Sequence, residues 1–457
     1  MKSQKNLAQQ TEAILEILES GFPAHRLELI WNNRAAILEW IHSDTFKQKY
    51  SKHPYPPLVN PETITYEGTD PSVAWDFNLP LPPYYTMLIS IMPGAGGTAF
   101  ERFLSLCEVD CYSKWYGHTL AYLENYKLFL QSQGTKALIL TDFVREDTKK
   151  FWSLINSDLP LIALVRDPIL VLKCLVNHTR PIEQNPLAKE FDLTCSYASI
   201  KPQIAYHCSN NKPNLEAVIQ DCINGLFRSI FCFAWKLAVI APKEVIYIDG
   251  EEINAENAFK TFETLSQKFG FNPPKKEDRE RFSKKANKNT GLLSHLPCVL
   301  HASIDKSGIP MRGGGKFVAD ITITTQLEFD KQMIDCTNLL MPNIYNTNIV
   351  LSTDKSGLES LKKSKKLQNA TKKFLEGYFN MIKEMDVETK KNLITPNQVL
   401  EYLKTHKTQC EQIKNIFDEE LAHIKKHRLD IVESWSYYQE FIKITGKSMQ
   451  KAKMANL

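Results

Sequence analysis

The feature that most constrains the fold is an uncharged apolar run followed at once by a glycine turn and an amphipathic helix, at residues 87–104. The run, MLISIM, suits a strand buried on both faces of a parallel sheet. Gly94, Gly96 and Gly97 follow, and glycine allows a positive φ and a close approach of ligand to backbone. From Thr98 the apolar residues recur with helical spacing. This order predicts an anion site, because the N–H groups and the positive dipole end of the helix face the turn. A tight connection that binds nothing is the alternative.

Length and composition indicate a globular protein of two or three domains. The chain has 457 residues, of which 43% are hydrophobic and 24% charged, and a net charge of +4, which gives no overall field favouring nucleic acid. Its ten cysteines include no CxxC pair, as expected of reduced thiols in a cytosolic protein. The first residues lack the apolar core of a signal peptide, and Lys236 and Lys243 interrupt the longest apolar stretch. We therefore expect a cytoplasmic protein, with at most a peripheral contact to the inner membrane.

Along the chain, strand and helix patterns alternate between two helical ends. Residues 1–50 predict two or three amphipathic helices, and residues 51–83, with eight prolines, predict an irregular linker. Strands are predicted at 87–92, 137–140, 161–165 and 245–248, and helices at 98–108, 117–132, 146–156, 168–178, 216–241 and 256–269. Alternation of this kind predicts a parallel sheet with helices on both faces.

Other stretches of the chain lack this alternation. Residues 180–215 are polar without a clear period and predict a long loop or lid, and residues 309–319, IPMRGGGKFVA, form a second glycine-rich loop. Residues 355–457 are helical in pattern and carry 20 Lys and Arg against 13 Asp and Glu. We therefore predict three segments: N-terminal helices and proline-rich linker at 1–83, an α/β domain at 84–350, and a helical C-terminal region at 351–457.

Four groups of residues between 85 and 335 resemble, in this order, the sulfotransferase family. They are AGGTAF (95–100), ILTDF (139–143), LIALVRDPILVLKC (161–174), and a late set of VIYIDGEEI (245–253), FGF (269–271) and MRGGGKFVADITITTQLEFDKQ (311–332). The resemblance implies an α/β, P-loop-like fold in which a parallel sheet is flanked by helices. It also implies a nucleotide donor, 3′-phosphoadenosine 5′-phosphosulfate, and no tightly bound cofactor.

The resemblance also implies a role for each residue of the site. It assigns the donor's 5′-phosphosulfate to Gly94, Ala95, Gly96, Gly97 and Thr98, and the rest of the nucleotide to Arg166, Cys174, Arg312, Gly313 and Gly314. Asp142 stands at the position of the catalytic base. Independently of the resemblance, His118 is the alternative base, because it follows WYG in a loop soon after the helix of the glycine turn. Lys316 would supply a cation. The residues themselves support part of this, since Arg166 directly follows an apolar strand, and open α/β sheets bind ligands at that edge.

Plainer interpretations of the same residues stay open. Asp142 could cap the helix that begins near Glu146 or pair with Arg145, and the Arg-Asp pair at 166–167 could be a local salt bridge. His178, His207, His295 and His301 are further histidines that could be catalytic, although each is more often an ordinary surface or capped residue.

Three positions depart from the family's pattern. Ala95 stands where the phosphate loop usually holds Lys or Arg, Cys174 replaces a nucleotide-binding Ser, and Asp142 replaces a His. The missing loop cation normally stabilises the leaving phosphate. Two alternatives therefore stay open: a glycosyl or phosphoramidate transferase that uses a cytidine or uridine nucleotide, and a non-catalytic nucleotide-binding scaffold.

The residues and the resemblance together predict a transferase acting on a glycan. It would move a sulfuryl or phosphoryl-type group from a nucleotide donor to a hydroxyl of a surface glycan or its lipid-linked precursor. The overall pattern also resembles an uncharacterised epsilonproteobacterial family, often described as sugar transferases, found among capsule and surface-glycan genes.

GxxxxGK[ST], HExxH and GxSxG are absent, which argues against an ATPase, a zinc protease or a serine hydrolase. The basic C-terminal region is most simply a solvated face, and attraction to an anionic membrane or an acidic glycan is the alternative.

Overall fold

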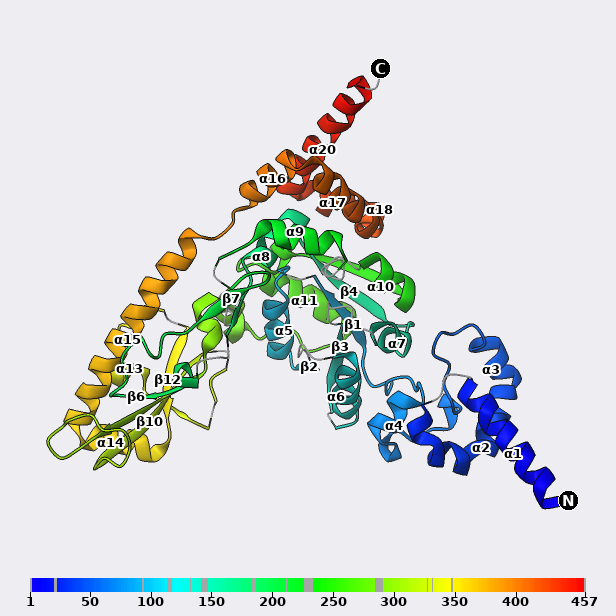
Figure 1. Ribbon diagram of the computed structural model, residues 1–457, viewed down its shortest axis with the longest axis horizontal. Coiled ribbons are helices and arrows are strands. Elements are labelled where there is room, and N and C mark those ends of the chain that lie inside the picture. Colours follow the sequence, from blue (N-terminus) through cyan, green and yellow to red (C-terminus); the bar gives the residue numbers. More distant parts are fainter. Residues whose placement is uncertain are drawn as a thin grey trace. The chain divides into compact units, whose positions relative to one another are not determined.

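The computed structural model describes residues 2–19, 23–92, 94–112, 117–131, 133–140, 147–182, 186–210, 212–225, 233–283, 291–326, 328–330, 332–346 and 348–455 (Figure 1). The chain divides into two compact units, each assembled from separate stretches. The first unit comprises residues 1–166, 227–284 and 416–432, and the second comprises 167–226, 285–415 and 433–457. The predicted boundaries near residues 83 and 350 divide the chain into segments that are continuous in sequence, whereas each of these units combines separate stretches. Those boundaries stay predictions.

The first unit is built on a five-stranded parallel sheet with the order β2–β3–β1–β4–β8. Its strands are β1 (Met87–Ile91), β2 (Val109–Cys111), β3 (Thr135–Leu140), β4 (Pro160–Val165) and β8 (Glu244–Asp249). All five residues of β1 are buried, because β1 lies between β3 and β4 in the middle of the sheet. The predicted parallel sheet is confirmed.

Helices flank this sheet on both faces. They are α5 (Gly97–Leu106), α6 (His118–Gln131), α7 (Thr148–Ser153), α10 (Phe233–Ile240), α11 (Ala258–Phe269), α12 (Arg279–Ser283) and α18 (Ala422–His427). Leu88 of β1 packs in one apolar cluster with Tyr122 of α6 and Trp152 of α7. On the opposite face Ile91 lies against the start of α5, and α5 packs on α11 through the ring of Phe262.

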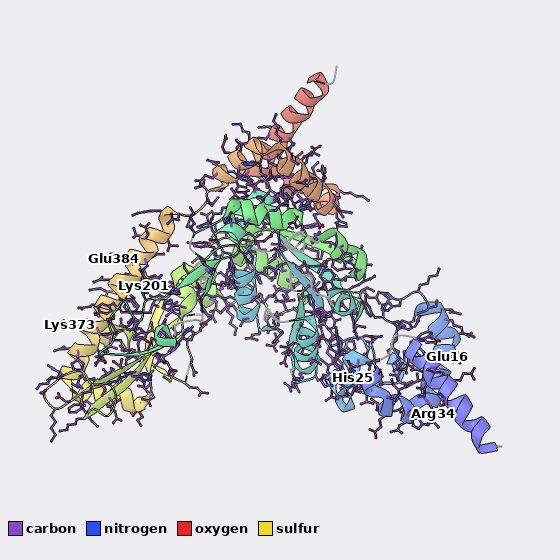
Figure 2. All side chains as sticks on the ribbon, viewed as in Figure 1. Glu16, His25, Arg34, Lys201, Lys373 and Glu384 are labelled. Atoms are coloured by element: carbon purple, nitrogen blue, oxygen red, sulfur yellow. The ribbon has the colours of Figure 1, made fainter. Side chains whose placement is uncertain are left out.

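The N-terminal helices join the same apolar cluster. They are α1 (Lys2–Glu19), α2 (Leu27–His42), α3 (Asp44–Lys49) and α4 (Pro71–Asp76). Ile17, Ile30 and Trp75 are buried in that cluster, while Glu16 and Arg34 of the same helices carry charge toward solvent (Figure 2). The amphipathic pattern predicted helices within residues 1–50. The stretch 51–83, predicted as an irregular linker, instead contains α4 and contributes Trp75 to the core, because its apolar residues pack into the same cluster.

The second unit contains a five-stranded sheet with the order β11–β12–β10–β9–β6. Its strands are β6 (Glu190–Asp192), β9 (Cys298–Ile304), β10 (Phe317–Thr325), β11 (Ile334–Asp335) and β12 (Ile349–Thr353). β10 runs antiparallel to β9 and β12, and β6 runs parallel to β9. A separate antiparallel pair joins β5 (Thr179–Pro181) to β7 (Ile204–Tyr206). The stretch 180–215, predicted as a loop or lid, therefore contains strands.

The helices of the second unit include the longest of the described chain. They are α8 (Pro168–Val176), α9 (Leu215–Ile223), α13 (Thr337–Leu340), α14 (Lys355–Lys363), α15 (Lys365–Lys391), α16 (Pro396–Thr405) and α20 (Ser436–Ala455). α17 (Lys407–Glu420) and α19 (Leu429–Ser434) contribute residues to both units. α15 buries Phe374 and Tyr378 against the antiparallel sheet, and Lys373 and Glu384 project from its outer face (Figure 2). The predicted helical C-terminal region is confirmed.

Three further observations bear on the sequence predictions. The predicted helix 216–241 is wrong at its centre, because α9 ends at Ile223 and Gly225 follows with a φ of +91°. Among the helices in the described ranges, none combines the length and the apolarity needed to cross a bilayer. No disulfide joins the cysteines of the described ranges.

Candidate functional site

The candidate site begins at the turn that joins β1 to α5 in the first unit. Gly94 and Gly96 have φ values of +75° and +98°, and Gly96 is the N-cap of α5. The carbonyl of Gly96 accepts hydrogen bonds from the amides of Ala99 and Phe100, each at 3.0 Å, which start the helix. Within the described residues, the amides of Gly97 and Thr98 have no acceptor. These N–H groups stand at the positive end of the helix dipole, where an anion would complete their hydrogen bonding.

Close packing explains why the turn needs glycine. A Cβ at residue 97 would lie 2.4 Å from Cγ2 of Ile91, and a Cβ at residue 96 would lie 2.8 Å from Cδ1 of Ile253. A side chain at residue 97 would therefore force Ile91 or the turn to shift. At residue 96 the stronger constraint is the φ of +98°, because Cδ1 of Ile253 is the movable end of its side chain. The glycines therefore fix the turn against β1 and against the segment that follows β8.

Arg166 joins the turn from the neighbouring strand. It follows β4 directly, and its Nη1 donates to the carbonyl oxygen of Gly94 at 2.6 Å. A Cβ at Gly250, the residue after β8, would lie 3.6 Å from the carbonyl oxygen of Ala95 and 3.7 Å from Cγ of Arg166. The ends of β1, β4 and β8 therefore meet at one point, where residue 250 lies within van der Waals distance of the glycine turn and of the arginine stem.

The order of the strands makes this point the natural ligand position of the sheet. The chain passes from β1 toward β2 and β3 on one side, and then crosses to β4 and β8 on the other. Open α/β sheets bind ligands outside the carboxyl ends of the strands where the order reverses in this way. The glycine turn and Arg166 lie on the two strands that flank the reversal.

An acidic turn supports the site from β8. Oδ1 of Asp249 accepts from the amide of Glu251 at 2.9 Å, and Oε1 of Glu252 accepts from the amide of Asp249 at 3.0 Å. This capping box fixes the short 3₁₀ helix at Gly250–Ile253 and so holds Ile253 against Gly96. In the described part of the chain, no group of three or more His, Cys, Asp or Glu side chains is arranged to hold a metal ion.

Lys236 is a buried cation within an apolar run, where the sequence pattern shows it only as an interruption. It lies on α10 with 3% of its surface exposed, and its Nζ donates to Oγ of Ser90 on β1 at 2.8 Å. The same Nζ lies 5.4 Å from the centre of the Trp152 ring. A buried ammonium is costly unless it is paired, so such a residue is expected to have a structural or functional role. The one signal for it was a single Lys inside the apolar stretch FAWKLAVI.

Of the two candidate bases, Asp142 and His118, the structure describes only His118. Asp142 lies outside the described residues, so its role stays a prediction. His118 is the first residue of α6 and is fully buried, with its ring 5.4 Å from the ring of Phe151 and 6.4 Å from that of Trp152. Its imidazole therefore belongs to the apolar core in this structure, and its catalytic assignment rests on the sequence alone.

The other predicted site residues belong to the second unit. Cys174 lies on α8. Arg312, Gly313, Gly314 and Lys316 lie in the loop between the antiparallel strands β9 and β10. Arg312 is 85% exposed and lies 3.9 Å from a carboxylate oxygen of Asp192. Their assignment to the nucleotide stays a prediction that rests on the resemblance.

Comparison with known proteins adds a match to part of the chain. Residues 247–447 match a family model described as a protein of unknown function (DUF2972). The match covers less than half of the chain, begins within β8 and ends within α20, so it leaves out the glycine turn and Arg166. No curated protein and no solved structure matches the chain.

The second unit holds two of the other histidines in a polar cluster. The rings of His178 and His207 are 5.6 Å apart, and Sγ of Cys208 donates to Oδ2 of Asp221 at 3.1 Å. Burial, with the nearby His178, lowers the pKa of His207 to about 4, and burial raises the pKa of the Cys208 thiol to about 12. Near neutral pH, His207 is therefore neutral and Cys208 is a thiol rather than a nucleophilic thiolate.

The lowered pKa of His207 predicts a loss of stability in acid. Above the ordinary value of 6.5 both folded and unfolded states hold neutral His207, and as the pH falls toward 4 only the unfolded state takes up the proton. We expect the thermal midpoint to fall over this range, and His207→Gln to flatten the dependence, as measured by pH-dependent thermal unfolding. His406→Gln, an exposed histidine of the same unit, is the control and should leave the slope unchanged. An equal slope in wild type and His207→Gln would contradict the prediction.

His295 and His301 have structural partners. Nε2 of His295 lies 2.7 Å from the hydroxyl of Tyr378, and both side chains are buried in the core of the second unit. Nδ1 of His301 lies 2.8 Å from Oδ1 of Asp320, its partner in the β9–β10 register. These contacts account for both residues without a catalytic role.

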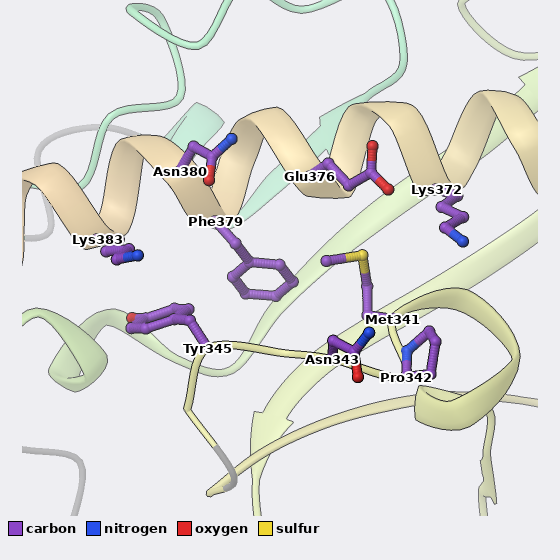
Figure 3. Close-up of a pocket in the computed structure, with 9 residues that line it drawn as sticks. All are labelled: Met341, Pro342, Asn343, Tyr345, Lys372, Glu376, Phe379, Asn380 and Lys383. Carbon is purple, nitrogen blue, oxygen red and sulfur yellow. The ribbon is translucent and has the colours of Figure 1, made fainter.

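A pocket of about 390 Å³ opens between α15 and residues 341–345 (Figure 3). The rings of Tyr345 and Phe379 form its apolar side, with centroids 6.2 Å apart, and Lys372 and Lys383 contribute ammonium groups. The pocket is chemically suited to a small ligand with an apolar face and a negative charge. All of its lining residues belong to the second unit.

Proposed function

We propose that the protein is a transferase of sulfotransferase-like, P-loop-like fold. It would move a sulfuryl or phosphoryl-type group from a nucleotide donor, such as 3′-phosphoadenosine 5′-phosphosulfate, to a hydroxyl of a surface glycan or its lipid-linked precursor. The observation that carries the proposal is the meeting of the glycine turn and Arg166 at the reversal point of the parallel sheet. A helix N-terminus and a guanidinium at the same sheet edge together suit a phosphate group. The resemblance of segments 95–100 and 161–174 to sulfotransferases supports the same assignment.

The proposed chemistry is an in-line displacement. The acceptor hydroxyl oxygen would bond to the sulfur as the bond from sulfur to the donor's 5′-phosphate oxygen breaks. The hydroxyl proton would pass to Asp142, and the nucleotide bisphosphate would leave with the electron pair. The amides of Gly97 and Thr98 would stabilise the charge that grows on the leaving phosphate. Lys236 adds a buried positive charge beside β1 in the same unit.

Because Ala95 stands in place of a cation, two other functions also fit the glycine turn. This residue is 1% exposed and occupies the position where the resembled loop holds a cation. Without that cation, a glycosyl or phosphoramidate transferase using a cytidine or uridine nucleotide, or a nucleotide-binding scaffold without catalysis, fits the same turn. The proposal places the protein in the cytoplasm, where nucleotide donors and lipid-linked precursors are available.

A nucleotide panel tests the three functions. A ligand at 100 times its Kd stabilises the folded protein by about 2.7 kcal/mol, which thermal unfolding measures readily. We expect stabilisation by adenosine 3′,5′-bisphosphate. Stabilisation by cytidine or uridine diphosphate instead would favour the second transferase, and binding without donor consumption in the presence of surface glycan would favour the scaffold. No response to any nucleotide would refute the phosphate site itself.

Arg166→Lys is expected to weaken binding of the stabilising nucleotide by about tenfold or more, because lysine cannot reproduce a bidentate guanidinium–phosphate contact. Titration calorimetry on the variant gives the affinity, and thermal unfolding without nucleotide gives the stability. Arg26→Lys is the matched control, since Arg26 is a partly buried arginine of the same unit that pairs with Asp76 at 2.7 Å. Lower stability with unchanged affinity would mean that Arg166 only braces the carbonyl of Gly94.

A further inference from the structure

The loop between β9 and β10, residues 305–316, exposes apolar side chains at its tip. Ile309 is 62% exposed, more than any other large hydrophobic side chain among the described residues, and Met311 is 38% exposed. Pro310 between them is exposed as well, so the tip presents three consecutive apolar residues to solvent. Isolated exposed side chains are common, but three at the end of a projecting loop indicate a contact surface.

The loop holds this tip in a fixed conformation. Oδ1 of Asp305 accepts from Oγ of Ser307 at 2.7 Å and from the amides of Gly308 and Ile309 at 2.8 and 2.9 Å. The amide of Met311 donates to the carbonyl of Ser303 at 2.9 Å. Since both sides of the tip are tied to β9, Ile309 and Met311 are displayed without a large entropy cost on binding.

Positive charge surrounds the tip. Nζ of Lys366 donates to the carbonyl of Ser307 at 3.1 Å, which attaches the start of α15 to the loop, and α14 packs on β10 (Figure 1). Residues 305–316 and 355–366 together carry eight Lys and Arg against two carboxylates, Asp305 and Glu359. Asp305 is engaged by the loop and Glu359 pairs with Lys363 at 3.3 Å. In the described structure Lys306, Lys362 and Lys365 are exposed without a carboxylate partner.

We propose that this tip and the surrounding lysines form a docking surface for an anionic lipid bilayer. Lysines would lie on the headgroups while Ile309 and Met311 enter the boundary between headgroups and acyl chains. Charge complementarity favours a polyanion as the partner. The aliphatic tip favours a bilayer over a single-stranded nucleic acid, because proteins that bind single strands usually offer aromatic side chains on which the bases stack. This surface lies wholly in the second unit, and the inference does not depend on the proposed transferase activity.

The test is sedimentation of the full-length protein with vesicles of phosphatidylglycerol and phosphatidylcholine, compared with phosphatidylcholine alone. We expect binding to the anionic vesicles, and a strong loss at high salt, because the screening length falls from about 10 Å at 0.1 M to about 3 Å at 1 M. Lys362→Glu with Lys365→Glu should weaken binding by at least about 25-fold, since each lysine near such a surface contributes about fivefold. Lys390→Glu with Lys391→Glu, at the far end of α15, is the charge control and should bind as wild type.

A second pair of variants separates a bilayer from other polyanions. Ile309→Asp with Met311→Asp should weaken vesicle binding by about tenfold or more, as the apolar contribution is lost. Val387→Asp, at an exposed aliphatic position on α15, is the control and should have no effect. All these positions are exposed, so thermal midpoints should match wild type. Absent vesicle binding, or binding unaffected by the tip variants, would overturn the proposal, as would tighter binding to RNA that ignores Ile309→Asp.

Discussion

Asp167→Ala is expected to lower the free energy of unfolding by about 3 kcal/mol or more, because this buried carboxylate caps helices of the second unit. Asp167 is 3% exposed. Its Oδ1 accepts from the amide of Ile169 at 2.9 Å, and its Oδ2 accepts from the amides of Tyr437 and Tyr438, each at 3.0 Å. One carboxylate therefore caps two helices, α8 and α20, that are far apart in the sequence.

The size of this effect follows from what alanine leaves behind. Three amides would lose their acceptor, two of them in buried and one in a partly buried position, and each unsatisfied buried donor costs about 1–3 kcal/mol. Burial raises the pKa of Asp167, although the hydrogen bonds from Tyr438 and Ile169 act in the opposite direction. These hydrogen bonds give the aspartate of the Arg-Asp-Pro segment a structural role that is independent of the role of Arg166.

Chemical denaturation measures the effect, and Asp354→Ala is the matched control. Asp354 caps only α14, through the amide of Gly357 at 2.7 Å, and is exposed, so its replacement should cost about 1 kcal/mol. If Asp167→Ala cost no more than Asp354→Ala, the double cap would not contribute as described.

The elements that the sequence predicted well are those whose pattern is local and long enough to be distinctive. β1, the glycine turn and α5 were predicted within two residues of their bounds because a charge-free run, three glycines and an amphipathic repeat follow one another. Arg166 was likewise predicted at the edge of the sheet, because an apolar strand ends at Val165. Proline at 168 marked the start of α8.

The antiparallel sheet was not predicted, because its strands depend on partners that are distant in the sequence. β6 has three residues and pairs with β9, which begins at Cys298, so no local pattern could reveal it. The division into two units is equally non-local, since each unit draws on three stretches of chain. Packing across such distances overrides the local propensities on which sequence patterns rest.

The sequence predicted the glycine turn of the candidate site, but it did not predict the buried charge of Lys236. Glycine positions follow from turn geometry, and the structure adds that Gly97 must clear Ile91. Lys236 was missed, because a lone lysine in an apolar helix normally reaches out to solvent, and only tertiary packing shows that its Nζ bonds to Ser90. The loop with Arg312 and Lys316 joins β9 to β10 in the second unit, and its predicted closure over a nucleotide stays a prediction.

Asp142→Asn is expected to lower turnover by about 10²–10⁴-fold with donor affinity kept, because removal of a general base slows proton transfer without removing the phosphate contacts. Asp142 follows Leu140, the last residue of β3, by two positions in the sequence, and Leu140 pairs with Ser90 beside the glycine turn. It precedes Arg166 in the same order as base and arginine in the resembled family. If Asp142 instead capped a helix, asparagine would replace it at little cost, because Asn and Asp cap helices about equally.

The measurement is the rate of nucleotide release from the donor in the presence of glycan acceptor, together with calorimetric affinity for the stabilising nucleotide. Asp147→Asn is the matched control, since Oδ2 of Asp147 accepts from the amide and hydroxyl of Thr119, each at 2.7 Å, a purely structural arrangement. That variant should lose some stability and retain turnover. Near-normal turnover in Asp142→Asn would remove Asp142 from the mechanism. His118 would then be the remaining candidate base, and because its ring is buried against Phe151, α6 would have to move before it could reach a substrate.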